Sequence, residues 1–116
     1  MIKTEKDYQS IVMKDLKTQW WWWYKIPDAN MQIKPFDIIW FNDMIQPIAI
    51  ELKICKLKKG LSYEQAYSML RPNQVWALKS FQSQWGAAFV RVYNITEAKE
   101  YRFDFKFLEN NDAGEL

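Results

Sequence analysis

The sequence predicts one α/β domain with a mixed central sheet flanked by helices. An amphipathic helix opens the chain, two apolar segments enclose a short polar turn, and helices and further strands follow. At 116 residues the chain can bury one core and is too short for two. We assign residues 1–108 to this single domain and residues 109–116 to a polar, acidic C-terminal tail.

Composition excludes several protein classes. Hydrophobic residues make up 49% of the chain and aromatic residues 17%, which excludes a disordered or linker-like protein. No segment approaches the roughly 20 apolar residues of a membrane span, and the N-terminus lacks the apolar stretch of a signal peptide. We therefore expect a cytoplasmic, intracellular protein that has no membrane partner.

The inventory of metal-binding side chains points to oxygen ligands. Cys55 is the single cysteine and the chain has no histidine, so the usual zinc patterns are excluded and a nucleophilic cysteine would lack a histidine to activate it. Carboxylate and carbonyl oxygens suit Mg²⁺ or Mn²⁺. Three of the fourteen acidic residues lie in the tail, so residues 1–108 carry sixteen basic and eleven acidic side chains, a net charge of +5. That charge is compatible with binding nucleic acid.

The first element is predicted as a helix from Thr4 to about Lys17, with Thr4 as its N-cap. Glu5 falls on the same side as the apolar stripe, which consists of Tyr8, Ile11, Val12 and Leu16. An acidic side chain that faces the core is unusual and suggests a functional role. A favourable place near the positive end of the helix dipole is the ordinary alternative.

Three strands are predicted next. Residues 19–26 are rich in aromatic strand formers, and residues 36–41 and 47–54 form a hairpin whose strands are apolar on both faces. A hairpin symmetric about Met44 places Asp37 opposite Glu51. Lys53 lies on the same face as Glu51 because side chains alternate along a strand.

The second half is predicted to hold two helices and two strands. Residues 56–60 form a basic loop, and Ser62 with Gln65 resembles a capping box that opens a helix to about Leu70. Pro72 suits the first turn of a second helix that ends before Gly86. Strands then follow at residues 87–93 and, as an edge strand, at residues 99–108.

The hairpin pattern predicts chemistry. Two carboxylates that face each other on central apolar strands repel, so a positive group is expected between them. A divalent cation meets this need more fully than Lys53 alone, and a bound cation can polarise a phosphoryl oxygen while Lys53 orients water or balances charge. This chemistry is phosphodiester hydrolysis. A surface salt-bridge cluster of Asp37, Glu51 and Lys53 is the structural alternative.

These residues resemble a known family. Pro35-Phe36-Asp37, followed after thirteen residues by Glu51-Leu52-Lys53, is similar to the PD-(D/E)xK signature of restriction-type nucleases and Holliday junction resolvases, with Phe36 as a departure. Residues 86–90 resemble a Gly-rich strand entry of archaeal-type and RecU-type resolvases. The resemblance implies a restriction-endonuclease-like fold and a Mg²⁺-dependent endodeoxyribonuclease of DNA recombination, with Mn²⁺ able to substitute.

The resemblance also implies roles for individual residues. Asp37, Glu51 and the carbonyl of Leu52 would bind the metal, and Lys53 would act on the water or the transition state. Glu5 would complete the metal environment as the family's N-terminal glutamate, and Gln74 would position the site. An exposed first-turn residue is the alternative for Gln74.

Partners are predicted from the basic side chains and from the family resemblance. Phosphate contacts are expected from a small set of basic side chains, namely Lys56, Lys58, Lys59 and Arg71. The expected assembly is a homodimer that acts on branched DNA, and the small size suggests a virus or mobile element such as a phage as the source. The alternatives are a nuclease for flaps, ends or duplex DNA, a non-catalytic nucleic-acid-binding module, and a structural partner. Residues 20–23, all Trp, remain open as core, dimer interface or DNA contacts.

Overall fold

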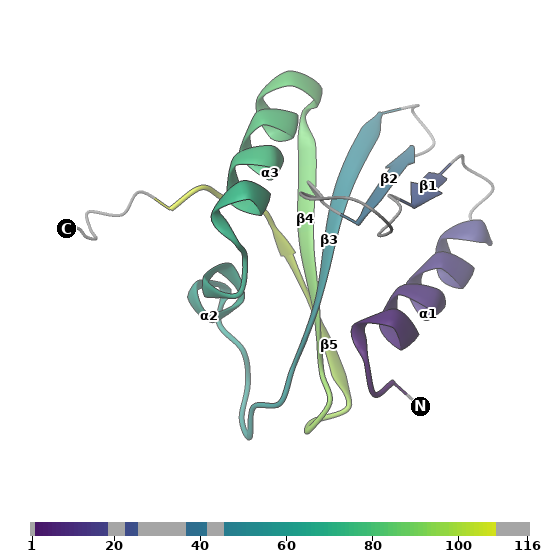
Figure 1. Cartoon of the computed structure of the whole chain (residues 1–116), viewed down its shortest axis with the longest axis vertical. Helices are drawn as coiled ribbons and strands as arrows, with labels where there is room; N and C mark the ends of the chain where they lie inside the picture. Colours follow the sequence, from purple (N-terminus) through teal and green to yellow (C-terminus); the bar gives the residue numbers. More distant parts are fainter. Residues whose placement is uncertain (1, 19–22, 26–36, 42–45, 109–116) are drawn as a thin grey trace.

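The structure is a computed structural model that describes residues 2–18, 23–25, 37–41 and 46–108. Figure 1 shows a sheet that is covered by helices on both sides. The elements follow in the order α1 (Glu5–Lys17), β1 (Trp23–Lys25), β2 (Ile38–Phe41), β3 (Pro47–Cys55), α2 (Tyr63–Ser68), α3 (Pro72–Trp85), β4 (Ala87–Asn94) and β5 (Lys99–Asp104). None of the helices in these ranges is long and apolar enough to cross a membrane.

The sheet is mixed, as predicted. Its strands lie in the order β1-β2-β3-β4-β5, and all neighbours are antiparallel except β3 and β4, which are parallel. The parallel pair is joined through α2 and α3, since a parallel connection needs a crossover. The predicted α/β fold with a central sheet flanked by helices is therefore confirmed.

Strands β2 and β3 pair in the predicted register. Ile39 lies opposite Ala49 and Phe41 lies opposite Pro47, which is the symmetry about Met44 expected from the sequence. The paired residues begin at Ile38, so Asp37 stands one position before the ladder. This register matters for function because a shift of one residue would move every side chain of β2 to the other face.

Helix α1 covers one face of the sheet (Figure 1). One cluster of buried side chains joins α1 to the even-numbered residues of β3, and it contains Ile2, Tyr8, Val12, Leu16, Ile38, Ile48, Ile50 and Leu52. A capping box fixes the start of the helix: Thr4 Oγ1 accepts the Asp7 N–H, and the Asp7 carboxylate accepts the Thr4 N–H.

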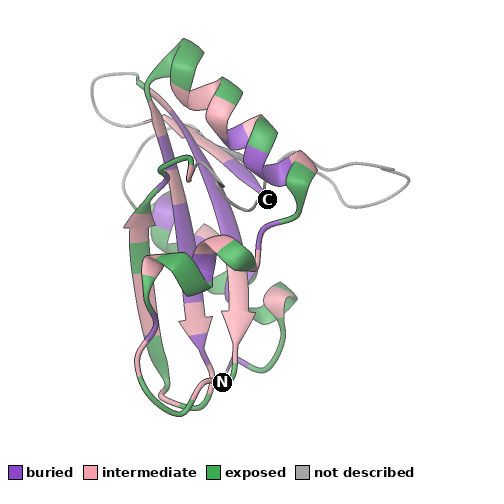
Figure 2. Cartoon of the chain, turned by 90° about the vertical axis from the view of Figure 1, so that its left-hand side faces the viewer, coloured by how far each residue is buried: buried purple, intermediate pink, exposed green. Residues whose placement is uncertain are grey.

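Helices α2 and α3 cover the other face, where a second buried cluster includes Ala49, Val75, Leu78, Ala88, Val90 and Phe105. The predicted capping box of Ser62 and Gln65 opens α2, and Pro72 lies at the start of α3. Gly86 ends α3 with φ of 108°, a conformation that favours glycine. In Figure 2 the central strands are mainly buried and the outward helix faces exposed.

Several predicted boundaries differ from the structure: β2 begins at Ile38, after Asp37, and β3 and β4 end one residue later than predicted, at Cys55 and Asn94. Strand β5 ends at Asp104 and not at Leu108, because β4 begins at Ala87 and offers few further partners: the Phe105 N–H still donates to the Ala88 carbonyl, but the backbone of Lys106 pairs with the Tyr63 hydroxyl. Helix α2 ends at Ser68, two residues earlier than predicted. Of the strand predicted over residues 19–26, β1 accounts for 23–25; residues 19–22 and 26, and the tail at 109–116, lie outside the described residues.

Candidate active site

Asp37 is held immediately before β2 by two donors to its carboxylate and by a hydrogen bond from its own backbone. It is 4% exposed, its Oδ2 accepts the Leu52 N–H at 2.8 Å, and its Oδ1 accepts Nε2 of Gln9 at 3.2 Å. Its own N–H donates to the Ile50 carbonyl at 3.1 Å. The side chain thus extends the β2–β3 pairing where the backbone ladder stops, which fixes the carboxylate against β3.

Glu51 lies in the middle of β3 and is 2% exposed. Its Oε2 accepts Nε2 of Gln74 at 3.2 Å and lies 3.4 Å from Nζ of Lys53. Its other oxygen, Oε1, is buried, and no donor from the described residues reaches it. A buried carboxylate therefore keeps one oxygen unused by the protein, which is unusual because buried polar atoms are nearly always hydrogen-bonded.

The electrostatics of Glu51 reflect this burial. The pKa of Glu51 is raised to about 8: loss of solvation is the largest cause, the negative charge of Asp37 adds to it, and the ammonium of Lys53 offsets only part of the rise. Glu5 also raises this pKa through its charge. The prediction that two acids meet at this end of the hairpin is thus supported by geometry and by electrostatics, and the exposed salt-bridge alternative does not fit side chains so deeply buried.

Gln74 connects the site to the start of α3. Its Nε2 donates to Glu51, and its Oε1 accepts the backbone N–H of Arg71 at 3.0 Å. Gln74 is 9% exposed, so the alternative of an exposed first-turn residue is excluded. Both ends of this amide are used, which ties the orientation of Glu51 to the N-terminus of the helix that covers it.

Gln9 is a site residue that the sequence reasoning missed. It is 6% exposed, and its amide donates to Asp37 from the other side of the sheet, on α1. Gln9 follows Glu5 by four residues, so the two share one helix face. The spacing of four residues from Glu5 is the sequence signal for Gln9, but an uncharged glutamine on a helix does not by itself indicate a site.

Glu5 itself is partly buried at the first turn of α1. Across the residues that the structure describes, no three carboxylate or thiolate side chains gather as a metal-binding group. Glu5 influences Glu51 through its charge, and its predicted part in the metal environment stays a prediction.

The predicted phosphate-binding side chains lie at different distances from the site. Arg71 is exposed, and its backbone N–H donates to the Gln74 side chain, which in turn donates to Glu51. The loop lysines Lys56, Lys58 and Lys59 are also exposed, but they lie beyond the end of β3, with Lys56 about 16 Å along the strand from Glu51. Their loop is bound to the β4–β5 turn, where Gly60 N–H donates to Glu97 at 3.0 Å.

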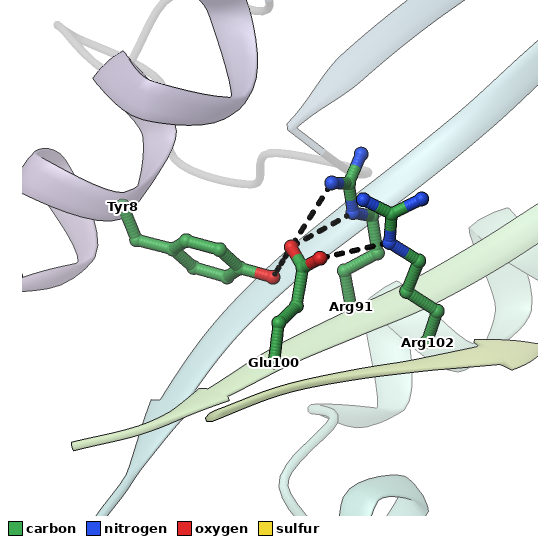
Figure 3. A network of polar contacts seen from close by, with 4 residues as sticks. All are labelled: Tyr8, Arg91, Glu100 and Arg102. Atoms are coloured by element: carbon green, nitrogen blue, oxygen red, sulfur yellow. Dashed lines mark hydrogen bonds and ion pairs between the residues drawn. The ribbon is translucent and has the colours of Figure 1, made fainter. Parts of the chain in front are cut away.

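A second polar cluster anchors α1 beside the site (Figure 3). Arg91 and Arg102 are cross-strand partners on β4 and β5, and both donate to Glu100, at 2.9 Å and 2.8 Å. Tyr8 of α1 donates its hydroxyl to the same carboxylate at 2.6 Å. Because Tyr8 precedes Gln9, this cluster fixes the part of α1 that reaches Asp37.

The donor set fits a hard divalent cation. Asp37 and Glu51 supply buried carboxylates, and the unused Oε1 of Glu51 is an acceptor that lacks a positive partner. Burial of like charges so close together is unfavourable without such a partner. The residues brought together here can therefore hold Mg²⁺ or Mn²⁺.

The structure is similar to solved structures, one of which is a resolvase. Hjc of Archaeoglobus fulgidus, a Holliday junction resolvase from an archaeal hyperthermophile, matches with a TM-score of 0.58 and 20% sequence identity, over 85% of this chain and 75% of that chain. The fold is similar to that of a resolvase. No protein-family model matches the sequence, and no curated protein sequence matches it. The likeness thus lies in the fold, which the sequence comparisons do not detect.

Proposed function

We propose that this protein is a metal-dependent DNA endonuclease of the PD-(D/E)xK type that cuts Holliday junctions or similar branched DNA. The observation that carries the proposal is the buried pair Asp37 and Glu51, with Lys53 beside it, on a fold similar to that of an archaeal resolvase. A binding module has no need for two buried acids near phosphate, since they would repel it.

In this proposal Asp37, Glu51 and the Leu52 carbonyl hold Mg²⁺, and Mn²⁺ substitutes for it. The bound cation supplies charge stabilisation to the scissile phosphate and favours ionisation of the attacking water. Hydrolysis consumes one water and leaves one phosphomonoester end and one hydroxyl end.

The protein's own groups then orient the reaction. Lys53 is already aligned with the site through its 3.4 Å contact with Glu51, and it donates to the attacking water or to the phosphate as negative charge develops. Gln74 keeps Glu51 in place, and the Leu52 N–H keeps Asp37 in place. A carboxylate fixed by packing and hydrogen bonds loses little entropy when the reactants bind.

Arg71 and the three loop lysines are proposed to contact backbone phosphates on either side of the cut. Arg71 lies next to the site, whereas the lysines lie at the far end of β3, so one DNA arm would extend along the strand between them. A homodimer would present two such surfaces at a fixed separation, which suits a four-way junction with two-fold symmetry.

The test is a cleavage assay on linear, flapped and four-way DNA of matched sequence, with Mg²⁺, with Mn²⁺ and with a chelator. The expected result is cleavage only with the cation and fastest on four-way DNA. Equal cleavage rates on all three substrates would support nuclease activity but exclude a specific resolvase activity. Tight DNA binding without cleavage under any cation would instead support the binding module.

A further inference from the structure

Gln9 uses one end of its amide at the site and leaves the other end available. Its Nε2 donates to Oδ1 of Asp37 at 3.2 Å, while its Oε1 is buried and has no donor among the described residues. The orientation of the amide is determined by this contact, because a carboxylate accepts hydrogen bonds and the reversed amide would place two acceptors together. The unpaired atom is therefore an acceptor that stays beside Asp37.

The buried oxygens without a hydrogen-bond donor indicate which kind of ligand would fit here. Of the buried side-chain atoms that lack a partner in the described part of the chain, two are oxygens, Gln9 Oε1 and Glu51 Oε1, and the third is the indole N–H of Trp40. The two oxygens belong to side chains that hold, or are part of, the carboxylate pair. Two buried acceptors without a donor, each on a side chain that contacts or faces Asp37, suit a positive ion or the hydrogens of its bound water.

Gln74 provides an internal comparison. It also donates Nε2 to a site carboxylate, but its Oε1 is satisfied by the Arg71 N–H. Two glutamines thus hold the two acids, one from each face of the sheet, and only the α1 glutamine retains an acceptor. Both polar ends of the Gln74 amide are used within the protein, whereas the Gln9 amide retains an acceptor that can contact a ligand.

We propose that Gln9 is an additional cation-site residue, which positions Asp37 through Nε2 and offers Oε1 to the bound divalent cation or to its coordinated water. The inference rests on the proposed function, since it assigns a residue to the same site. An amide oxygen is a suitable ligand for Mg²⁺ and Mn²⁺. It also adds no negative charge, so it completes the oxygen set without increasing the repulsion between Asp37 and Glu51.

The test measures Mn²⁺ binding by calorimetry and by the Mn²⁺-induced rise in melting temperature, so it does not depend on cleavage. Gln9→Leu removes both polar ends, Gln9→Met repeats the change with a more adaptable side chain, and Gln9→Glu keeps an acceptor but repels Asp37. Val12→Ala, also on α1 but in the apolar cluster, is the matched control for loss of packing. Circular dichroism verifies that each variant is folded.

We expect Gln9→Leu and Gln9→Met to bind Mn²⁺ at least about tenfold more weakly, with a smaller rise in melting temperature. Gln9→Glu should melt lower without metal and show a larger Mn²⁺-induced rise than the unmodified protein. Val12→Ala should melt lower with an unchanged rise. Unchanged Mn²⁺ affinity in folded Gln9→Leu or Gln9→Met would overturn the inference and leave the proposed function standing, whereas no Mn²⁺ binding by the unmodified protein would overturn both.

Discussion

The Leu52 backbone N–H donates to Oδ2 of Asp37 at 2.8 Å, so one residue of the central strand holds a carboxylate of the neighbouring strand. Leu52 lies between Glu51 and Lys53, and its own side chain is fully buried under α1. The contact links the two halves of the predicted signature. Any movement of β2 relative to β3 would separate them.

Asp37→Asn is expected to preserve the fold and abolish cleavage. The new amide oxygen can still accept the Leu52 N–H, and its NH₂ can donate to Gln9 once the Gln9 amide turns over. Loss of one negative charge from the proposed cation site should lower the cleavage rate by about a hundredfold or more. Single-turnover cleavage at saturating Mg²⁺ provides the measurement, with melting temperature as the control. Rapid cleavage by the folded variant would contradict the site assignment.

Glu51→Gln is expected to raise the stability of the metal-free protein. Because its pKa is about 8, Glu51 must take up a proton at neutral pH or carry a buried charge beside Asp37, and either reduces stability; the amide avoids this cost and retains an acceptor for Gln74 and Lys53. Mg²⁺ or Mn²⁺ should raise the melting temperature of the unmodified protein by several degrees and that of the variant far less, because binding to the folded state alone stabilises it. Calorimetric melting with and without the cation tests both statements. A lower metal-free melting temperature for the variant would count against the predicted repulsion.

Much of this site could be predicted from the sequence. The turn about Met44 and the alternation of β3 were enough to bring Asp37 near Glu51 and to place Lys53 beside it, because register in a hairpin follows from local pattern. Gln74 was also placed in the site, although the mechanism, a bridge to the Arg71 N–H, required the structure.

The contacts made across the fold could not be predicted. Gln9 reaches Asp37 from α1, and Tyr8 reaches Glu100 at a separation of 92 residues. Such pairs depend on how far the helix lies along the sheet, which helix periodicity does not specify. The end of β5 was missed for a similar reason: the alternating aromatics continue past Asp104, but β4 begins at Ala87, and the backbone of Lys106 pairs with the Tyr63 hydroxyl of α2 and not with a strand.

Glu100 should control stability in acid. Burial alone would raise the pKa of Glu100, but hydrogen bonds from Tyr8 and Arg102 and the charge of Arg91 outweigh it, so the pKa is lowered. The unfolded chain then binds a proton more readily than the folded one. The contribution of Glu100 is accordingly present above its ordinary pKa of 4.5 and lost as the pH falls through the lower folded value.

Glu100→Gln should therefore destabilise the protein by about 1–3 kcal/mol at pH 7, since it removes the carboxylate that accepts hydrogen bonds from the opposed Arg91 and Arg102. The loss should shrink as the pH falls below 4. Urea unfolding from pH 3 to pH 7 measures the difference, and Glu64→Gln, an exposed acid on α2, is the control. A difference that does not depend on pH would show that Glu100 acts by packing alone.

Arg71 and the loop lysines should differ in their effects on DNA. Arg71→Ala removes a cation next to the site while the backbone N–H that binds Gln74 remains, so cleavage and binding should both fall. Substitution of Lys56, Lys58 and Lys59 together by Ala should weaken binding and flatten the dependence of log K on log salt by up to about 0.9 per lost contact. Cleavage at saturating DNA should change little. An unaltered salt slope would show that the loop is only solvated.

The last prediction concerns assembly and substrate. We expect a homodimer that binds four-way DNA more tightly than linear duplex of the same sequence and makes two symmetrically related nicks. A domain with one sheet and three helices in its described part, together with the proposed cation site, has little surface left for reading bases. Recognition of DNA shape through phosphate contacts is therefore expected. Two sites at a fixed separation match the two-fold symmetry of a junction, whereas linear duplex offers no reason to engage both.

Sedimentation of the free protein and a gel comparison of junction with duplex binding test the two halves separately. A dimer formed from one active protomer and one Asp37→Asn protomer should nick a junction once, because each site cuts one strand. A monomer that cuts linear duplex as fast as a junction would retain the nuclease and exclude the resolvase. A monomer that still prefers junctions would show that a single copy of this fold reads branch geometry, and the requirement for two-fold symmetry would then be wrong.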